Sequence, residues 1–312
     1  MVRTIADLGP FLNIKHNIKL NLDWHFCCAC HIINRAAVDA IKFIKEDVEK
    51  LRNLIKAIQC SQRLRAQFKQ VQVRLGNANP KEPPCLDVET CWNSLYNMVQ
   101  KSFEVKPTLE CMYNDANLNL TELALTNTDW TEMNHVVNFL DFAAKVTTEA
   151  SGSNYTTISL QPLIYQKLLH HCNEIILFNT DEDTGDVVSK VGQAAKAFKD
   201  KLKKYGDFMN SKFNRLALML DPRVEKTEDD AEFYKPFFRH ILQSEYKITL
   251  KSSQDNEDYK PYYLFDFHED EAMDEVDKYF SANSKPNKNC TDVIEWWHNT
   301  GVHEYPSIAS IA

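Results

Sequence analysis

The residues best suited to chemistry in this sequence are three cysteines and a histidine close to its start. Cys27, Cys28, Cys30 and His31 lie within five positions. Cys28 and His31 have the Cys-x-x-His spacing of half a tetrahedral zinc site, but no second Cys-x-x-Cys or His-x-x-x-His pair follows downstream. A thiol beside an imidazole can also act as a nucleophile, but no orienting third group is recognisable. We therefore predict a junction packed with small thiols, without metal or catalytic residues.

Three acidic runs, at residues 181–186, 228–232 and 269–275, could supply carboxylate ligands for Mg²⁺. Their density and the polar residues between them favour solvated loops and helix faces. The sequence contains no phosphate-binding loop, no Gly-x-Gly-x-x-Gly and no Gly-x-Ser-x-Gly motif. The sequence thus predicts no cofactor, and Mg²⁺ only if the chain is an active nuclease that uses these acids.

Trp92 lies in the first turn of a helix that is expected after the proline-rich loop at residues 76–84. The surrounding segment, residues 87–94, reads Asp-Val-Glu-Thr-Cys-Trp-Asn-Ser. Two interpretations remain open for Trp92: it packs in the core, or it stacks on a nucleic-acid base. Trp92 is therefore a DNA-binding candidate, with packing the favoured alternative.

A pair of tryptophans dominates the end of the chain. Trp296 and Trp297 would point about 100° apart on a helix and form one wide aromatic surface. The surface could close a local core or anchor a subunit interface, where Trp and Tyr are enriched. We expect residues 281–312 to be poorly anchored to the monomer and to drive dimerisation or aggregation that depends on concentration. The candidate dimerisation residues are Trp296, Trp297, Tyr305, Pro306 and Ile308.

Length and composition limit the class of protein. With 312 residues, 44% hydrophobic and 26% charged, the chain can form one large or two moderate domains. The net charge of −8 gives no overall electrostatic footprint for nucleic acid. No apolar run is long enough to span a membrane, so no membrane partner is expected. The nine cysteines are scattered and no export signal precedes them, which predicts reduced thiols in the cytosol or nucleus.

Hydrophobic spacing predicts a mostly helical chain. One short strand is expected at residues 21–29, before the first long helix. The longest helical run is expected over residues 188–220, ending at Asp221-Pro222 because proline disfavours helix in the preceding residue. Further helices are expected over residues 31–45 with a continuation to 58, 61–71, 91–103, 118–124, 131–148, 160–176, 233–248 and 269–280.

Five short motifs, taken in order, resemble those of hAT-type transposases, the family that includes domesticated BED-type zinc-finger proteins. The motifs are Cys28-x-x-His31-Ile-Ile-Asn34, residues 87–94, Thr147-x-x-x-Ser151-Gly152-x-x-Tyr155-Thr156-Thr157, Lys204-Tyr205 with Leu220-Asp221-Pro222-Arg223, and Trp296-Trp297 with Tyr305-Pro306. The resemblance covers nearly the whole chain. It departs from the family at Arg35, which takes the place of Leu, at Thr156, where proline is usual, and at Cys91, which takes the place of Arg.

The resemblance implies that catalysis needs two Asp and one Glu, which hold divalent metal on an RNase-H-like sheet. We expect the two Asp to fall before Met1 and the Glu beyond Ala312, and we expect no BED zinc finger in this chain. Cys91 in place of Arg would also remove a phosphate contact or an active-site hydrogen bond.

The expected fold is mainly α. It comprises a truncated RNase-H-like α/β remnant at residues 1–45, a helical insertion domain at 46–265 and the start of the hAT dimerisation region at 266–312. The RNase-H-fold hAT-like part of the insertion is placed at about residues 145–245.

The expected function is that of a catalytically inactive, transposase-derived protein of the nucleus. Its expected partners are a second copy of itself, through the C-terminal segment, and DNA. Two alternatives remain: an active metal-dependent transposase or nuclease that uses Asp181, Asp183 or Asp186, and an interaction scaffold with no DNA role.

Overall fold

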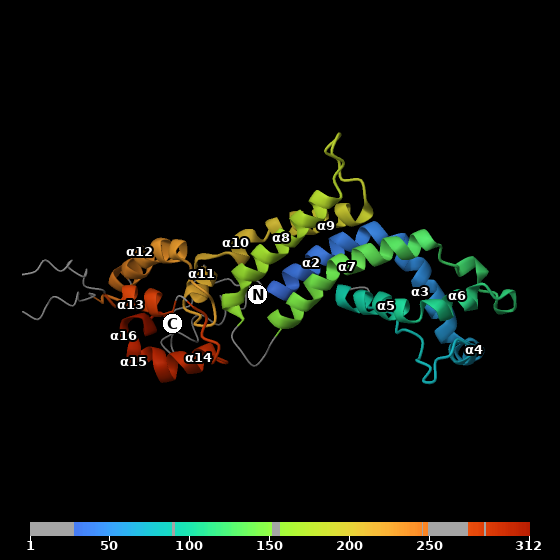
Figure 1. Ribbon diagram of the computed structural model, residues 1–312, viewed down its shortest axis with the longest axis horizontal. Helices are drawn as coiled ribbons and strands as arrows, with labels where there is room; N and C mark the ends of the chain where they lie inside the picture. The colour runs from blue at the N-terminus through green and yellow to red at the C-terminus, as the bar shows by residue number, and fades with distance from the viewer. Residues whose placement is uncertain (1–27, 89–90, 152–156, 245, 249–273, 284) are drawn as a thin grey trace, which may run out of the picture. The chain divides into compact units, whose positions relative to one another are not determined.

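Hydrophobic side chains recur every three or four positions through most of this chain, and the computed structural model folds these stretches into helices (Figure 1). The structure describes residues 28–88, 91–151, 157–244, 246–248, 274–283 and 285–312. Within these ranges β-pairing is limited to one isolated bridge between Thr180 and Val187. The prediction of a mainly α fold is confirmed.

The described residues form two compact units. Unit 1 holds those from residue 28 to 151 and from 163 to 209, and unit 2 holds residues 157–162 and those from 210 to 312. These limits do not coincide with the domain limits expected at residues 45 and 265. The strand expected at residues 21–29 lies outside the described residues except for its last two positions, and Ala29 already begins a helix.

Unit 1 contains most of the longer helices. They are α2 (Ala29–Ile41), η2 (Lys42–Ile44), α3 (Lys45–Cys60), α4 (Gln62–Arg74), α5 (Trp92–Glu104), α6 (Lys106–Tyr113), η3 (Ala116–Leu118), η4 (Thr121–Leu123), α7 (Asn127–Ala150), α8 (Gln161–Phe178, from residue 163 onward), α9 (Lys190–Lys203) and α10 (Gly206–Met209). The segment expected as a helix over residues 118–124 forms short 3₁₀ turns instead, because Asn119 adopts a left-handed conformation with φ of 55°.

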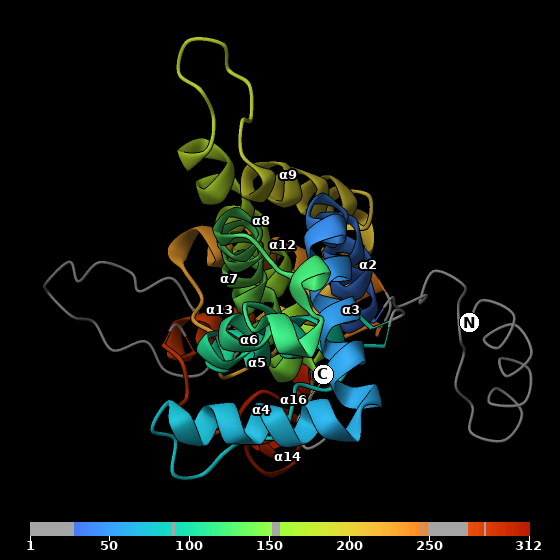
Figure 2. The same ribbon diagram turned by 90° about the vertical axis from the view of Figure 1, so that its right-hand side faces the viewer.

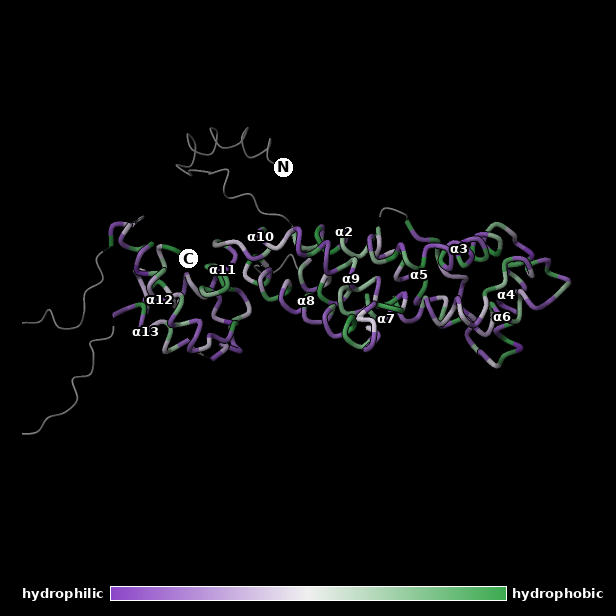
Figure 3. Tube along the Cα trace, turned by 90° about the horizontal axis from the view of Figure 1, so that it is seen from above, coloured by the Kyte–Doolittle hydropathy of each residue, from purple (hydrophilic) through white to green (hydrophobic). Residues whose placement is uncertain are grey.

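Helix α2 is at the centre of unit 1, packed against α7 and α9 (Figure 1, Figure 2). Its small residues Ala36, Ala37 and Ala40 are fully buried, which lets the neighbouring helices approach closely. Along these helices hydrophobic and hydrophilic residues alternate every few positions (Figure 3). Such amphipathic helices bury one face each, and together they form the core of the unit.

Side-chain caps fix where several of these helices begin. Ser61 accepts the backbone N–H of Leu64 at the start of α4. At the start of α7, Thr126 and Asp129 form a reciprocal capping box. At the start of α9, Ser189 accepts the backbone N–H of Gly192 as a single N-cap bond.

Unit 2 is built from shorter helices. They are η5 (Ile158–Leu160), α11 (Lys212–Met219), α12 (Glu228–Ser244), α13 (Glu275–Ala282), α14 (Val293–Trp296), a π-helical turn labelled η6 (Trp297–Gly301), α15 (Val302–Glu304) and α16 (Pro306–Ala309). The core of unit 2 is aromatic: the ring of Tyr279 lies 5.6 Å from that of Trp297 and 5.2 Å from that of Tyr305. Arg239 of α12 binds Asp274 and Asp277, which joins α12 to α13.

The long helix expected over residues 188–220 is wrong. The structure divides this stretch into α9, α10 and α11, with turns at residues 204–205 and 210–211. Ser211 has an extended backbone and accepts the N–H of Asn214, so it starts a new helix where the hydrophobic pattern alone predicted continuation. The expected end of the run before Pro222 is confirmed, because α11 stops at Met219.

In the part of the chain that the structure describes, no helix is long and apolar enough to cross a bilayer.

Candidate functional site

The cysteine and histidine cluster lies at the start of α2. Cys28 and His31 are exposed, whereas Cys30 faces the end of α7, where its Sγ lies 3.3 Å from the Ser151 hydroxyl. Burial raises the pKa of the Cys30 thiol, which opposes the thiolate form that nucleophiles and metal ligands need. Among the described residues no group of three or more His, Cys, Asp or Glu is placed to hold a metal ion. Cys27 lies outside the described residues.

The same helix start also meets the beginning of α5. Asn34 of α2 lies opposite Trp92, whose backbone N–H points at the Asn34 side-chain oxygen at 3.5 Å. Cys91, the N-cap residue of α5, offers no side-chain cap, so this amide is the nearest acceptor for that orphan N–H. Three motifs that are far apart in the sequence therefore meet at one junction of unit 1: the α2 start, the α5 start and the α7 end.

A buried ion pair fixes the loop before α5. Both carboxylate oxygens of Asp87 accept from Arg52 of α3, at 2.8 and 2.7 Å. The Asp87 side chain is almost fully buried, and its bond raises the pKa of the Arg52 guanidinium above the usual value. Ser94 then closes the loop by accepting the N–H of Val88 at 2.8 Å. The acid and the serine of the segment 87–94 thus act as structural groups.

Trp92 is packed in the core of unit 1. Its side chain is only 3% exposed, and its ring lies 6.2 Å from that of Tyr96. This burial supports the packing interpretation, because base stacking needs an open ring face. DNA contact by Trp92 stays a prediction.

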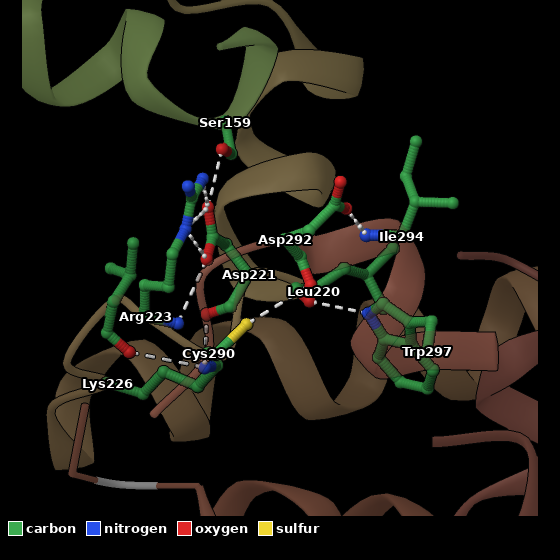
Figure 4. A network of polar contacts seen from close by, with 10 residues as sticks. Ser159, Leu220, Asp221, Arg223, Lys226, Cys290, Asp292, Ile294 and Trp297 are labelled. Carbon is green, nitrogen blue, oxygen red and sulfur yellow. Dashed lines mark hydrogen bonds and ion pairs between the residues drawn. The ribbon is translucent and has the colours of Figure 1, made fainter. Parts of the chain in front are cut away.

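Unit 2 contains a second cluster, the Asp221 network, which we define as Ser159, Asp221, Arg223 and Lys226 (Figure 4). Asp221 has 0% exposure, and its carboxylate accepts from the Ser159 hydroxyl at 2.6 Å and from Arg223 Nη2 at 2.7 Å. Burial alone would raise the pKa of Asp221, but the hydrogen bonds from Arg223 and Ser159 outweigh it and lower the pKa below its usual value. The carboxylate is therefore held ionised inside the unit.

Lys226 is the fourth residue of the network and binds the backbone of the turn. Its Nζ donates to the carbonyl oxygens of Asp221, at 3.0 Å, and of Val224, at 3.3 Å. It also lies 5.4 Å from the centre of the Tyr279 ring, within the range of a cation–π contact. The side chain is 4% exposed, and this burial lowers the pKa of Lys226 to about 8 against the attraction of Asp221.

The Leu-Asp-Pro-Arg turn also receives Trp297, one of the tryptophan pair (Figure 4). Trp297 Nε1 donates to the Leu220 carbonyl at 2.8 Å, and the Tyr279 hydroxyl donates to the Met219 carbonyl at 2.8 Å. Both carbonyls belong to the end of α11, where the helix leaves them without an intrahelical partner. Trp297 of the C-terminal segment and Tyr279 of α13 thus cap α11.

The expectation that residues 281–312 are poorly anchored is wrong within unit 2. Trp297, Tyr305 and Ile308 are buried there, and the backbone N–H of Ile308 donates to Glu275 at 2.8 Å. Trp296 is half-buried against Trp297, and Pro306 is exposed. Of the five candidate dimerisation residues, three are therefore internal anchors, and only Trp296 and Pro306 reach the surface of the unit.

The acidic residues of the three runs have different structural roles. Asp181 Oδ1 accepts the backbone N–H groups of Asp183 and Thr184, so it shapes its own turn. Asp230 binds Thr227 at the start of α12. The run at residues 269–275 lies largely outside the described residues, and its last residue, Glu275, binds the C-terminal segment.

Lys226, Ser159 and Tyr279 were not singled out from the sequence. A lone lysine after a proline turn and a serine 62 positions before its partner carry no periodic signal. The only usable signal was the Leu-Asp-Pro-Arg motif itself, since Arg two positions after Asp can close on the same turn.

Comparisons with known proteins show which proteins this chain is similar to. A family model for the ZBED1 RNase-like helical domain matches residues 26–139, which lie in unit 1 where the structure describes them. A putative AC transposase from Zea mays is 25% identical to this chain over 93% of the chain and 38% of its own length. A putative AC9 transposase from Zea mays is also 25% identical, over 93% of the chain and 40% of its own length. The zinc finger BED domain-containing protein RICESLEEPER 1 of Oryza sativa subsp. japonica is 29% identical over 43% of the chain and 18% of its own length. The chain spans about two fifths of the length of the two maize relatives.

Proposed function

We propose that this chain, which is similar to hAT-type transposases, acts in the nucleus as a non-catalytic helical protein that self-associates and contacts DNA. The observation that supports self-association best is the C-terminal segment. Trp297 and Tyr305 anchor it to unit 2, while other apolar side chains on the same segment remain uncovered.

The uncovered side chains are Ile294, which is 70% exposed, and Val302, which is 45% exposed, with Trp296 half-buried between them in sequence. A pre-folded apolar surface loses less conformational entropy on association than a loose segment does. We therefore place the self-association surface on Ile294, Trp296 and Val302, and we assign Trp297, Tyr305 and Ile308 the task of holding that surface in shape.

Sedimentation velocity of the full chain over a range of concentrations tests this. The double variant Ile294→Ser/Val302→Ser should shift the chain toward monomer without a change in melting temperature. The matched control is Leu177→Ser/Phe178→Ser at the end of α8, where both side chains are also highly exposed; it should leave self-association unchanged. A monomeric wild type, or equal loss in both variants, would refute this surface.

The absence of catalysis is the second part of the proposal. The competing function is metal-dependent cleavage through Asp181, Asp183 or Asp186. Because the Asp181 carboxylate already accepts two backbone N–H groups of its own turn, we infer that it serves the loop. Cleavage of linear and hairpin duplexes in Mg²⁺ or Mn²⁺ is the test: turnover that is abolished by Asp181→Ala or Asp183→Ala would establish the nuclease instead.

The DNA contact is the third part, and it rests on the transposase relatives. The alternative is an interaction scaffold without a DNA role. Binding of duplex DNA that falls with rising salt supports the contact, and absence of binding at physiological salt supports the scaffold.

A further inference from the structure

One stretch of this acidic chain has the opposite charge. Residues 50–81 contain eight Lys and Arg and no Asp or Glu, in a chain of net charge −8. The stretch covers most of α3, all of α4 and the loop that follows. An acid-free run of this length within a mixed-charge protein concentrates positive potential on one part of unit 1.

Helix α4 presents this charge in a defined pattern. Its inner face is formed by Leu64, Phe68 and Val71, all buried. The opposite face is uncharged and exposed; at 100° per residue it consists of Gln62, Ala66, Gln70 and Val73. Basic side chains lie along both borders of that face, with Arg65 and Lys69 on one side and Arg63 and Arg74 on the other.

Ion pairs neutralise some of the basic residues and leave others free. Lys50 binds Asp129, Arg52 binds Asp87, Lys69 binds Glu82 and Lys81 binds Glu104. Lys56, Arg63, Arg65 and Arg74 are exposed, and none of the ion pairs among the described residues includes them. Three arginines on α4 and Lys56 on α3 therefore have no acidic partner in the part of the chain that the structure describes.

The position of α4 leaves this face open within its unit. The helix lies beside α3 and α6 at one end of unit 1 (Figure 1, Figure 2). Its contacts with these two helices use the buried face, so the basic borders do not hold the unit together.

We propose that the outer face of α4 binds the phosphate backbone of duplex DNA through Arg63, Arg65 and Arg74. The inference deepens the DNA contact of the proposed function and rests on it. A helix is about 10 to 12 Å across, which matches the roughly 12 Å width of the major groove, and phosphates run along both sides of that groove. Cations on both borders of an uncharged face fit that arrangement.

An acidic peptide is the competing ligand. A peptide strand would need one row of cations, whereas α4 has unpaired cations on both borders of its uncharged face, Arg65 on one and Arg63 and Arg74 on the other. Arginine is also the side chain whose planar fork suits phosphate best, and three of the four unpaired cations are arginines. The pattern therefore favours a duplex.

The experiment compares two triple variants of the full chain that change the net charge equally. The first is Arg63→Gln/Arg65→Gln/Arg74→Gln. The control is Lys196→Gln/Lys199→Gln/Lys203→Gln on α9, where three lysines share one face with Asp200 beside them and make none of the ion pairs among the described residues. Binding to a fluorescent duplex is measured over a salt series, and melting temperature and sedimentation are recorded on the same samples.

We expect the α4 variant to reduce the slope of log Kobs against log salt by about 2 to 3, and to weaken binding at low salt by tenfold or more, because three phosphate contacts contribute about 0.9 each. The α9 variant should keep the wild-type slope. An unchanged melting temperature shows that α4 still folds.

Other outcomes overturn the inference in distinguishable ways. Equal losses in both variants would mean that net charge alone matters. Retained binding by the α4 variant would move the DNA contact elsewhere and leave the proposed function intact. Wild-type binding to polyglutamate but not to the duplex would assign the face to an acidic protein partner. The sedimentation data test self-association independently of this result.

Discussion

Asp87 in unit 1 and Asp221 in unit 2 both bury a carboxylate against an arginine, but the arginines come from different distances along the chain. Asp87 is bound by Arg52, 35 positions earlier, so the pair ties a loop to α3. Asp221 is bound by Arg223, two positions later, so the pair shapes a single turn. The long-range links to this turn come instead from Ser159, which donates to Asp221, and from Trp297, which donates to the neighbouring Leu220 carbonyl.

This difference shows two ways of using the same ion pair. In unit 1 the pair itself joins separate elements, and apolar packing of Trp92 supports it. In unit 2 the pair prepares a rigid turn, and other groups dock onto the backbone and side chains of that turn. The consequences for stability should therefore differ, and substitutions can measure the difference.

The largest effect is expected at Trp92. Trp92→Ala removes a buried aromatic side chain from the unit 1 junction and should cost about 3 to 5 kcal/mol of unfolding free energy. Urea denaturation followed by circular dichroism measures the loss. The half-buried Trp296 is the control and should cost clearly less when changed to Ala; an unchanged melting temperature for Trp92→Ala would contradict core packing.

The next effect is expected at Asp221. Asp221→Ala leaves Arg223 without its carboxylate and should destabilise unit 2 by about 3 kcal/mol, the lower end for a broken buried pair, because the Arg223 side chain is 20% exposed. Trp297 fluorescence during denaturation should report the change. Glu225→Ala, an exposed acid on the same turn, is the control and should be neutral within about 0.5 kcal/mol.

Lys226 should make the stability of unit 2 depend on pH. Its pKa is about 8 in the folded chain and 10.5 without burial, so between these values the unfolded chain binds more protons. Stability relative to Lys226→Met should therefore rise as pH increases from 8 to 10.5, with a slope of at most about 1.4 kcal/mol per pH unit, and should be flat below pH 8.

Urea denaturation of both proteins at about pH 7 and about pH 9.5 checks this prediction. Taking the difference between them cancels the titrating groups that do not contact Lys226. A difference that falls or stays constant across this range would show that Lys226 is not held in the low-pKa environment of the turn.

The smallest effect is expected at the start of the C-terminal segment. Asp292 accepts the N–H groups of Ile294 and Glu295 at the start of α14, so Asp292→Ala should cost about 1 kcal/mol. Hydrogen exchange at residues 294–296 locates the effect. A similar loss of protection across unit 1 would show that the cap acts through more than its own helix.

The sequence predicted the helices well wherever a single hydrophobic face ran without interruption. The starts of α5 and the end of α11 followed from proline and turn residues that act locally. The break between α9 and α11 was missed because the apolar spacing of Phe198, Leu202 and Met209 continues through it. That spacing predicted one helix, although Ser211 is a residue type that often begins a new one.

The candidate sites were predicted only in part. The motif residues were identified, but their partners were not, because the bonds that decide their roles join distant positions such as Asn34 with Trp92 and Ser159 with Asp221. The same reason explains the error about the C-terminal segment. Its anchors, Leu220 and Tyr279, contain nothing that marks them as partners of Trp297 in a linear sequence.

The π-helical turn at Trp297–Gly301 bears on how this segment should be aligned with its relatives. A π turn contains one residue more than an α turn, so the side chains after Gly301 are rotated by about 100° from where an uninterrupted helix would place them. A Cβ at position 301 would overlap the Trp297 ring, which ties the extra residue to that tryptophan. A relative that lacks the turn should therefore match this chain only with a one-residue gap between the tryptophan pair and the Tyr-Pro step.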